Sequence, residues 1–106
     1  MSDWVTVAAE DDFAVGSYRV VPLDDVEVVV VRTETGFYAV ENRCTHADVP
    51  LADGALRDET ITCPKHGAQF CLKTGAALTL PAVEAVTTFP VRVANGLVQV
   101  RDARWD

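Results

Sequence analysis

The sequence predicts an all-β fold built from antiparallel strands. Apolar and polar residues alternate with a period of two in several short segments, and β-branched residues dominate those segments. No window of eleven residues shows a convincing apolar period of 3.6, the period of a helix. Turn signals separate the segments, namely Glu34-Thr35-Gly36, Lys73-Thr74-Gly75 and Asn95-Gly96. Together these observations favour an antiparallel sandwich or barrel.

Eight strands are expected along the chain. In order they are Trp4 to Ala8, Ser17 to Val21, Val26 to Arg32, Phe37 to Val40, Thr60 to Cys63, Ala68 to Leu72, Ala85 to Val93 and Leu97 to Arg101. The pair Asn95-Gly96 suits the positive φ values of a type I′ turn, so the last two strands should form a hairpin.

The alternation within this hairpin predicts one face toward a core, formed by Phe89, Val91, Val93, Val98 and Val100.

Two stretches read as loops. The acidic run from Glu10 to Asp12 predicts a solvated loop. Between Glu41 and Thr60 the chain contains Pro50, Gly54 and few β-formers, which predicts a long loop. A long loop in a compact domain is usually functional or disordered, and metal ligands would give this one a reason for order.

Length and composition indicate one folded domain spanning residues 1–106. Hydrophobic residues make up 49% of the chain and charged residues 24%, a balance that argues against disorder. The formal net charge of −7 argues against a nucleic-acid partner, because no Lys/Arg cluster is available to neutralise phosphates. Residues 43–75 carry four basic and four acidic groups, so the acidic excess lies in the rest of the chain. That excess either keeps the protein soluble or steers basic partners toward it.

No membrane partner is expected. Apolar runs such as Val28 to Val31 are far shorter than the roughly 20 residues that cross a bilayer. The N-terminus has neither a basic start nor an apolar signal core, so the expected location is cytoplasmic. In that reducing compartment, neighbouring Cys and His residues indicate a metal before a disulfide.

The chemistry is concentrated in two Cys/His pairs. The first is Cys44-x-His46, and after sixteen intervening residues comes Cys63-x-x-His66. A centre with two irons could take both cysteines on one iron and both histidines on the other, as in Rieske [2Fe–2S] centres. Structural zinc is the chemical alternative, although zinc sites usually pair Cys with Cys and His with His. Nucleophilic catalysis by Cys44 or Cys63 is a second alternative, but it uses one pair and leaves the other unexplained.

The motifs CTHADVPLADGAL and CPKHGAQFCLKTG resemble the Rieske ferredoxin family, in particular the small ferredoxin components of bacterial aromatic-ring dioxygenases. The resemblance extends more loosely through ALTLPA to the closing strands. It implies a Rieske domain of antiparallel sheets with a small cluster-binding subdomain at about residues 42–81. By the same resemblance, Cys44, His46, Cys63 and His66 hold one [2Fe–2S] cluster, and Pro81 belongs to the loop that flanks it. Gly67 would let the chain fold tightly around the cluster.

The implied function is one-electron transfer, not catalysis. The partners would be a flavin-dependent ferredoxin reductase, which supplies the electron, and a terminal Rieske non-haem iron oxygenase, which receives it. A small subunit of an assimilatory nitrite reductase is the alternative within the same fold.

The sequence departs from the high-potential members of the family. Val49 and Lys65 stand where those members carry an additional disulfide, Ala68 where they carry serine, and Phe70 where they carry tyrosine. Fewer donors would stabilise the reduced cluster, so the predicted potential lies near the lower end of the Rieske range, about −150 mV.

The remaining cysteine and the aromatic residues are expected to pack. Cys71 belongs to neither pair and is predicted to be a small core residue beside Phe70. Core or peripheral packing is likewise expected of Trp4, Phe13, Phe37, Tyr38 and Phe89.

Overall fold

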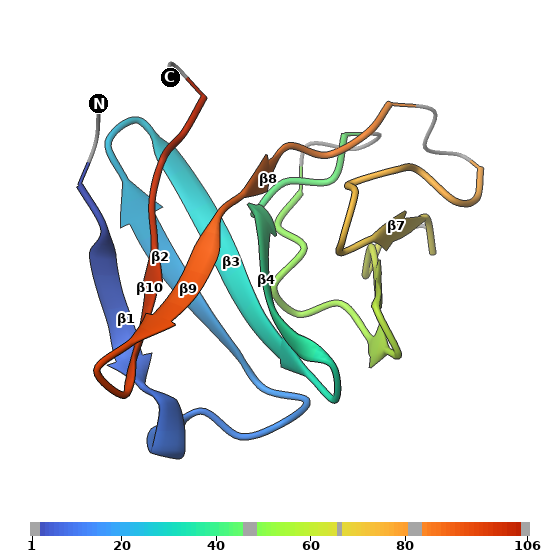
Figure 1. The fold of residues 1–106 in the computed structure, drawn as a ribbon. Coiled ribbons are helices and arrows are strands. Elements are labelled where there is room, and N and C mark those ends of the chain that lie inside the picture. Colours follow the sequence, from blue (N-terminus) through green and yellow to red (C-terminus); the bar gives the residue numbers. More distant parts are fainter. Residues whose placement is uncertain (1–2, 46–48, 66, 81–83, 105–106) are drawn as a thin grey trace.

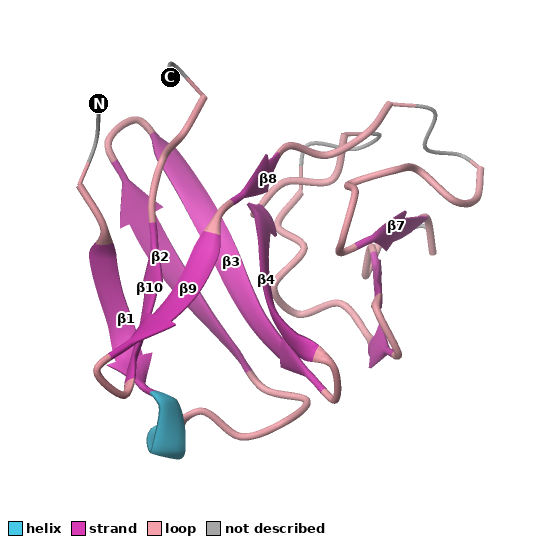
Figure 2. Ribbon diagram, viewed as in Figure 1, coloured by secondary structure: helices cyan, strands magenta, loops and turns pink. Residues whose placement is uncertain are grey.

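The fold is that of a computed structural model, which describes residues 3–45, 49–65, 67–80 and 84–104. Within these residues the secondary structure is β-sheet with one short 3-10 helix, η1 (Glu10–Asp12) (Figure 2). The all-β prediction is therefore confirmed. In the same part of the chain, no helix is long and apolar enough to cross a membrane.

The strands form three antiparallel sheets (Figure 1). The first sheet has the order β1-β10-β9, with β1 (Val5–Ala9), β10 (Leu97–Val100) and β9 (Val91–Ala94). The second sheet has the order β2-β3-β4-β8, with β2 (Tyr18–Leu23), β3 (Val26–Thr33), β4 (Gly36–Glu41) and β8 (Thr88–Phe89). The third sheet has the order β5-β6-β7, with β5 (Leu56–Arg57), β6 (Thr60–Thr62) and β7 (Gln69–Cys71).

Strand β3 is buried on both of its faces, which accounts for the layered arrangement of the sheets. Its run Val28 to Val31 is completely buried, although side chains along a strand point to opposite faces in turn. Val28 and Val30 belong to a core cluster shared with the first sheet, and Val29 and Val31 to a second cluster shared with the third sheet. The second sheet is thus covered on both faces, which an unbroken apolar run requires.

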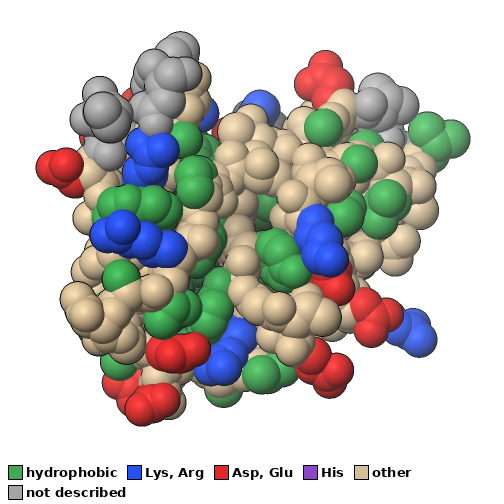
Figure 3. All heavy atoms as spheres, viewed as in Figure 1, with side chains coloured by type: hydrophobic (Ala, Val, Ile, Leu, Met, Phe, Trp, Pro, Cys, Tyr) green, Lys and Arg blue, Asp and Glu red, His purple; other side chains and the backbone are tan. Residues whose placement is uncertain are grey.

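The first core cluster lies between the first and second sheets. Its buried members are Phe13, Val21, Leu23, Val28, Val30, Ala39, Phe89, Val98 and Val100. Phe37 packs against this cluster and Tyr38 against the second, so both aromatic residues pack as predicted. Trp4 is half-buried at the edge of the first sheet, where the guanidinium carbons of Arg92 and Arg101 lie 4.3 and 5.5 Å from its ring. In Figure 3, basic and hydrophobic side chains lie side by side over this sheet.

The C-terminal hairpin is confirmed. Ala94 pairs with Leu97, and the two turn residues Asn95 and Gly96 have φ values of 54° and 75°, as a type I′ turn requires. One part of the prediction is wrong. Val93 shares a face with its partner across the hairpin, Val98, which is completely buried, but Val93 lies on the edge strand β9 and is 42% exposed.

Three further expectations need correction. The predicted strand from Ala85 to Val93 is two strands, β8 and β9, separated by Pro90, which has no N–H to donate to a ladder. Strand β5 lies inside the stretch that was expected to be loop, because its two residues are too few to produce a period. The acidic run from Glu10 to Asp12 forms η1, although its side chains are at the surface, as expected of a solvated segment.

Candidate metal centre

Two of the four predicted ligands lie together in the second core cluster. Cys44 is 0% and Cys63 1% exposed, and both pack in the cluster that contains Val29, Leu51 and Phe70. This cluster fills the space between the second sheet and the third. The fold therefore brings the cysteine of the first motif and that of the second into one apolar environment.

Each cysteine begins a loop that the backbone closes in the same way. The N–H of Cys44 donates to the carbonyl of Val49 at 2.7 Å, and the N–H of Cys63 donates to the carbonyl of Ala68 at 2.7 Å. In both loops the acceptor lies five residues beyond the cysteine. The two motifs thus form loops that are closed by the same backbone hydrogen bond, although their sequences differ.

Gly67 completes the second loop. Its N–H donates to the carbonyl of Cys63 at 3.1 Å, and its φ is +76°, which L side chains rarely adopt. A Cβ at this position would meet no atom within 4 Å, so the conformation, not crowding, is what requires glycine. The prediction that Gly67 permits a tight loop is consistent with this geometry.

The other two predicted ligands, His46 and His66, lie outside the described residues, as does Pro81. Among the residues that are described, no group of three or more His, Cys, Asp or Glu side chains is arranged to hold a metal ion. The described part of the chain therefore contains the two predicted sulfur donors, and the two nitrogen donors stay a prediction from the sequence motif.

A third segment contacts the first loop. The hydroxyl of Thr45 donates to the carbonyl of Glu84 at 2.8 Å, and the N–H of Val86 donates to the carbonyl of Gly75 at 2.8 Å. Farther along the second motif, the N–H of Gln69 donates to the Thr79 hydroxyl at 3.0 Å. These bonds place Thr79 beside the second motif, Glu84 beside the first loop and Val86 beside Gly75.

Sequence reasoning missed two side chains that order these loops, Asn42 and Thr45. Asn42 lies two residues before Cys44 and is only 8% exposed. The only feature of the sequence that could have pointed to either residue is its position close to a predicted ligand. Neither residue type indicates by itself that its partner would be a distant backbone group.

The third cysteine has a different environment. All three cysteines are thiols and form no disulfide, but Cys71 is half-buried and does not belong to the core cluster. Phe70, its neighbour on β7, is completely buried. The prediction of Cys71 as a core residue is therefore wrong, because the alternation along β7 directs Phe70 inward and Cys71 toward the other face.

The sulfur donors fit an iron–sulfur cluster. Two buried thiols on equivalent loops, with no disulfide between them, match the two cysteine ligands of a Rieske centre. The apolar side chains around Cys44 and Cys63 keep water away from these two residues.

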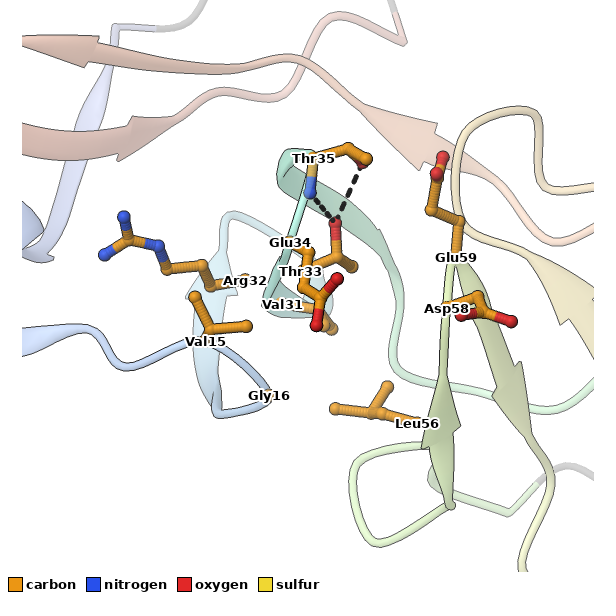
Figure 4. A pocket seen from close by; sticks show the side chains of 10 residues that line it. All are labelled: Val15, Gly16, Val31, Arg32, Thr33, Glu34, Thr35, Leu56, Asp58 and Glu59. Carbon is orange, nitrogen blue, oxygen red and sulfur yellow. Dashed lines mark hydrogen bonds between the residues drawn. The ribbon is translucent and has the colours of Figure 1, made fainter.

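The cavity shown in Figure 4 lies elsewhere. It has a volume of about 210 Å³ and lies between the β3–β4 turn and the β5–β6 turn. Thr33 and Thr35 line one side, Leu56, Asp58 and Glu59 line the other, and neither cysteine contributes. The cavity is thus separate from the candidate metal centre.

The family model for the Rieske [2Fe-2S] domain matches residues 3–90. The chain belongs to the Rieske [2Fe–2S] domain family. Its cofactor is accordingly a Rieske [2Fe–2S] cluster, which decides against the structural zinc alternative.

Comparison with known proteins identifies several Rieske relatives. The 3-phenylpropionate/cinnamic acid dioxygenase ferredoxin subunit of Escherichia coli (strain K12) is 51% identical over 61 residues, which cover 57% of this chain and 58% of that relative. The structure of the ferredoxin of carbazole 1,9a-dioxygenase from Nocardioides aromaticivorans IC177 matches with a TM-score of 0.88 and 35% identity, covering 94% of this chain and 98% of that one. A putative NADH-dependent nitrite reductase small subunit from Mycobacterium tuberculosis matches with a TM-score of 0.85 and 29% identity, covering 97% and 98% of the two chains.

Proposed function

We propose that Cys44, His46, Cys63 and His66 are the four ligands of this Rieske cluster. The two cysteines support the proposal directly, because they are buried in one apolar cluster at equivalent points of two loops. The histidines follow from the motif spacing. In this arrangement each loop would contribute one thiolate and one imidazole, with the imidazoles on one iron and the thiolates on the other.

The proposed function is one-electron transfer between a flavin-dependent ferredoxin reductase and a terminal Rieske non-haem iron oxygenase that attacks an aromatic ring. The observation that carries it is the 51% identity to a dioxygenase ferredoxin subunit. The cluster supplies a site that accepts and releases one electron without a change in covalent structure. The protein would then be a carrier and not itself an enzyme, and its location would be the cytoplasm, where thiols stay reduced.

The chain's own contribution is to bury the thiolates and to limit hydrogen bonding to the cluster. Ala68 and Phe70 are completely buried and carry no hydroxyl, so neither side chain can donate to a sulfur. Fewer donors give the reduced state less stabilisation. We therefore expect a midpoint potential of about −150 mV, and potentiometric titration followed by visible absorption measures it. A midpoint above zero would contradict this expectation. Ala68→Ser adds a hydroxyl donor, so its midpoint potential should be higher than that of the parent protein.

Two assays test the ligation itself. Iron and acid-labile sulfide analysis of freshly prepared protein should give two of each per chain, as a [2Fe–2S] cluster requires. The EPR spectrum after reduction with dithionite should show a lower average g value than a four-cysteine cluster gives. Cys63→Ser should lower the iron content sharply, whereas Cys71→Ser serves as the matched control and should leave it unchanged. A silent spectrum with no sulfide would refute the proposed site.

Electron transfer is tested by stopped-flow mixing. The cluster should be reduced rapidly by a flavoprotein ferredoxin reductase and reoxidised by a Rieske oxygenase. The alternative, a small subunit of an assimilatory nitrite reductase, is favoured by the match to the Mycobacterium tuberculosis structure. It predicts a fixed stoichiometric complex with a large reductase subunit, which size-exclusion chromatography detects, whereas the carrier should bind each partner reversibly.

A further inference from the structure

Asn42 uses its buried side chain to join three parts of the chain. Its Oδ1 accepts hydrogen bonds from the N–H groups of Leu51 and Ala52 at 2.9 and 2.8 Å. Its Nδ2 donates to Oε1 of Glu27 on β3 at 2.8 Å, and its own N–H donates to the Glu27 carbonyl at 2.8 Å. An amide oxygen has two lone pairs, so the acceptor capacity of this side chain is fully used.

These bonds close the segment that contains Cys44. The chain leaves the end of β4 at Asn42 and returns to the Asn42 side chain at Leu51, which is completely buried. Between these points, Cys44 donates to Val49 through its backbone. Both ends of the first loop are therefore attached to one side chain.

The second loop needs no such side chain. Cys63 directly follows β6, and the chain returns in β7, so Thr62 and Gln69 pair across the ladder and close the loop. The first loop starts after a strand but returns to residues 51 and 52, which belong to no strand, because β5 begins only at Leu56. The side-chain amide of Asn42 thus closes the first loop, whereas strand pairing closes the second.

We propose that Asn42 is a positioning residue for the metal centre. By accepting from the Leu51 and Ala52 N–H groups, it fixes the first loop and with it the sulfur of Cys44 relative to the sulfur of Cys63. The inference rests on the proposed ligation by Cys44. The acceptor oxygen is the essential atom, because it satisfies two backbone donors that are otherwise buried without a partner. The bond to Glu27 is secondary, because that carboxylate is at the surface.

The test compares variants of the cluster-loaded protein. Asn42→Leu preserves approximate size but removes the acceptor, and iron loss to a chelator should become on the order of tenfold faster. Its reduced EPR spectrum should show shifted or broadened g values, since the sulfur is less well fixed. Asn42→Asp combined with Glu27→Gln keeps an oxygen that can accept from both N–H groups and replaces the facing carboxylate by an amide that can donate to the new one. Its rate of iron loss should stay within about threefold of the rate of the Glu27→Gln single variant. Where Asn42→Leu yields no soluble protein, Asn42→Ser replaces it, because the shorter side chain also withdraws the acceptor.

Thr33→Val is the matched control. Thr33 is also a buried polar residue, and its hydroxyl bonds in the β3–β4 turn, at the other end of these strands from Asn42. The control should lower the melting temperature without changing the g values or the rate of iron loss. The proposal fails when Asn42→Leu or Asn42→Ser matches the parent in both readouts, or when the Asn42→Asp/Glu27→Gln double variant is as impaired as they are. If the parent protein contains no iron and sulfide, the proposed ligation is refuted. If the parent contains the cluster but the Asn42 variants behave like it, only the inference about Asn42 is refuted.

Discussion

Cys71 is half-buried, whereas the two predicted cysteine ligands are completely buried. A hydrogen bond from the Thr74 side chain, supported by the backbone of Thr74, lowers the pKa of the Cys71 thiol. Partial burial and the nearby Glu59 carboxylate oppose this shift. The pKa nevertheless lies below the ordinary value for cysteine, so more of the reactive thiolate is present at neutral pH. Such a half-buried thiol should be the one that reagents reach first.

Thiol labelling of the cluster-loaded protein tests this assignment. At pH 7 and without denaturant, a disulfide reagent should modify one cysteine per chain, because the other two are buried and, in the proposed ligation, bind the cluster. Cys71→Ala should abolish this reaction without changing the visible absorption of the cluster. Labelling of more than one cysteine before the visible absorption falls would contradict the assignment.

Thr74 variants test the cause of the lowered pKa. Thr74→Val removes the hydroxyl and should raise the pKa of Cys71, so that labelling at neutral pH slows by about threefold. Thr74→Ser keeps the hydroxyl and is the matched control, with an expected rate close to that of the parent. Equal rates for both variants would assign the lowered pKa to another group. The rate is measured under pseudo-first-order conditions across a pH series.

Among the elements, the first loop and strand β6 approach each other at Gly54. An ideal Cβ built at Gly54 would lie 1.9 Å from the Thr62 carbonyl oxygen and 2.9 Å from that of Leu51. Thr62 immediately precedes Cys63, and Leu51 donates to Asn42. Gly54 therefore permits close backbone contact between the segments that lead to both cysteines.

Gly54→Ala should disturb both loops together. The methyl group requires the backbone to move, since real Cβ atoms do not approach a carbonyl oxygen this closely. We expect the melting temperature to fall by roughly 10 °C or more and the iron content to fall with it. Gly16→Ala is the control, because its Cβ meets no atom within 4 Å and only the φ of +85° is unfavourable. Its melting temperature should fall by roughly 5 °C with full iron content. A Gly54→Ala protein with normal iron content would contradict the prediction.

The long strands and the turns between them were predictable from the sequence because each depends on neighbouring residues. A β-branched run located β3, alternation located β10, and the residue types of Asn95 and Gly96 identified the turn between β9 and β10. Strand β5 was not predicted because pairing with β6 holds it, and its own residues show no pattern of a strand. The exposure of Val93 was not predicted, because alternation shows which residues share a face but not how far the core extends.

The candidate site, like the fold, was only partly predictable from the sequence. The spacing of the cysteines and histidines indicates two ligand loops without reference to tertiary structure. The contacts that hold those loops are different in kind. Asn42 bonds to Glu27, fifteen residues earlier, and to backbone N–H groups nine and ten residues later. Thr45 bonds to the carbonyl of Glu84, thirty-nine residues away. A backbone partner leaves no residue type to search for, so these bonds become visible only in the folded chain.

Across the whole molecule, polar side chains tie the layers together around their apolar clusters. Tyr18 on the second sheet donates to Asp53 at 2.9 Å, and Tyr38 donates to Glu59 at 3.4 Å. Lys73 lies 3.1 Å from the same Glu59 carboxylate, and its hydrogen bond lowers the pKa of Glu59. These contacts fasten the second sheet to the segments that surround the third.

The C-terminal segment is fastened through Arg104. Its guanidinium bonds both oxygens of Asp102, with Nε to Oδ1 at 2.9 Å and Nη2 to Oδ2 at 2.7 Å. The same Nη2 bonds Asp25 in the β2–β3 turn at 2.6 Å. The side chain of Asp102 is completely buried, whereas that of Asp25 is 75% exposed. Arg104 thus joins the segment after β10 to the second sheet, and its side-chain hydrogen bonds lower the pKa of both carboxyl groups.

The pH dependence of stability follows from the sign of the Asp102 shift. Because the folded-state pKa is lower than that of the unfolded chain, Asp102 stabilises the fold above the unfolded pKa of about 4, and this contribution is lost as the pH falls through the folded pKa. Asp102→Asn should lower the melting temperature by roughly 5 °C at pH 7, and the difference from the parent should shrink below about pH 4. Comparison with the parent at each pH cancels the titration of the cluster ligands, which both proteins share. Asp25→Asn is the matched control, because an exposed carboxylate is screened by solvent, and its effect should be within about 2 °C. Equal effects of the two variants, or a difference for Asp102→Asn that persists at low pH, would show that burial of the ion pair does not stabilise this segment.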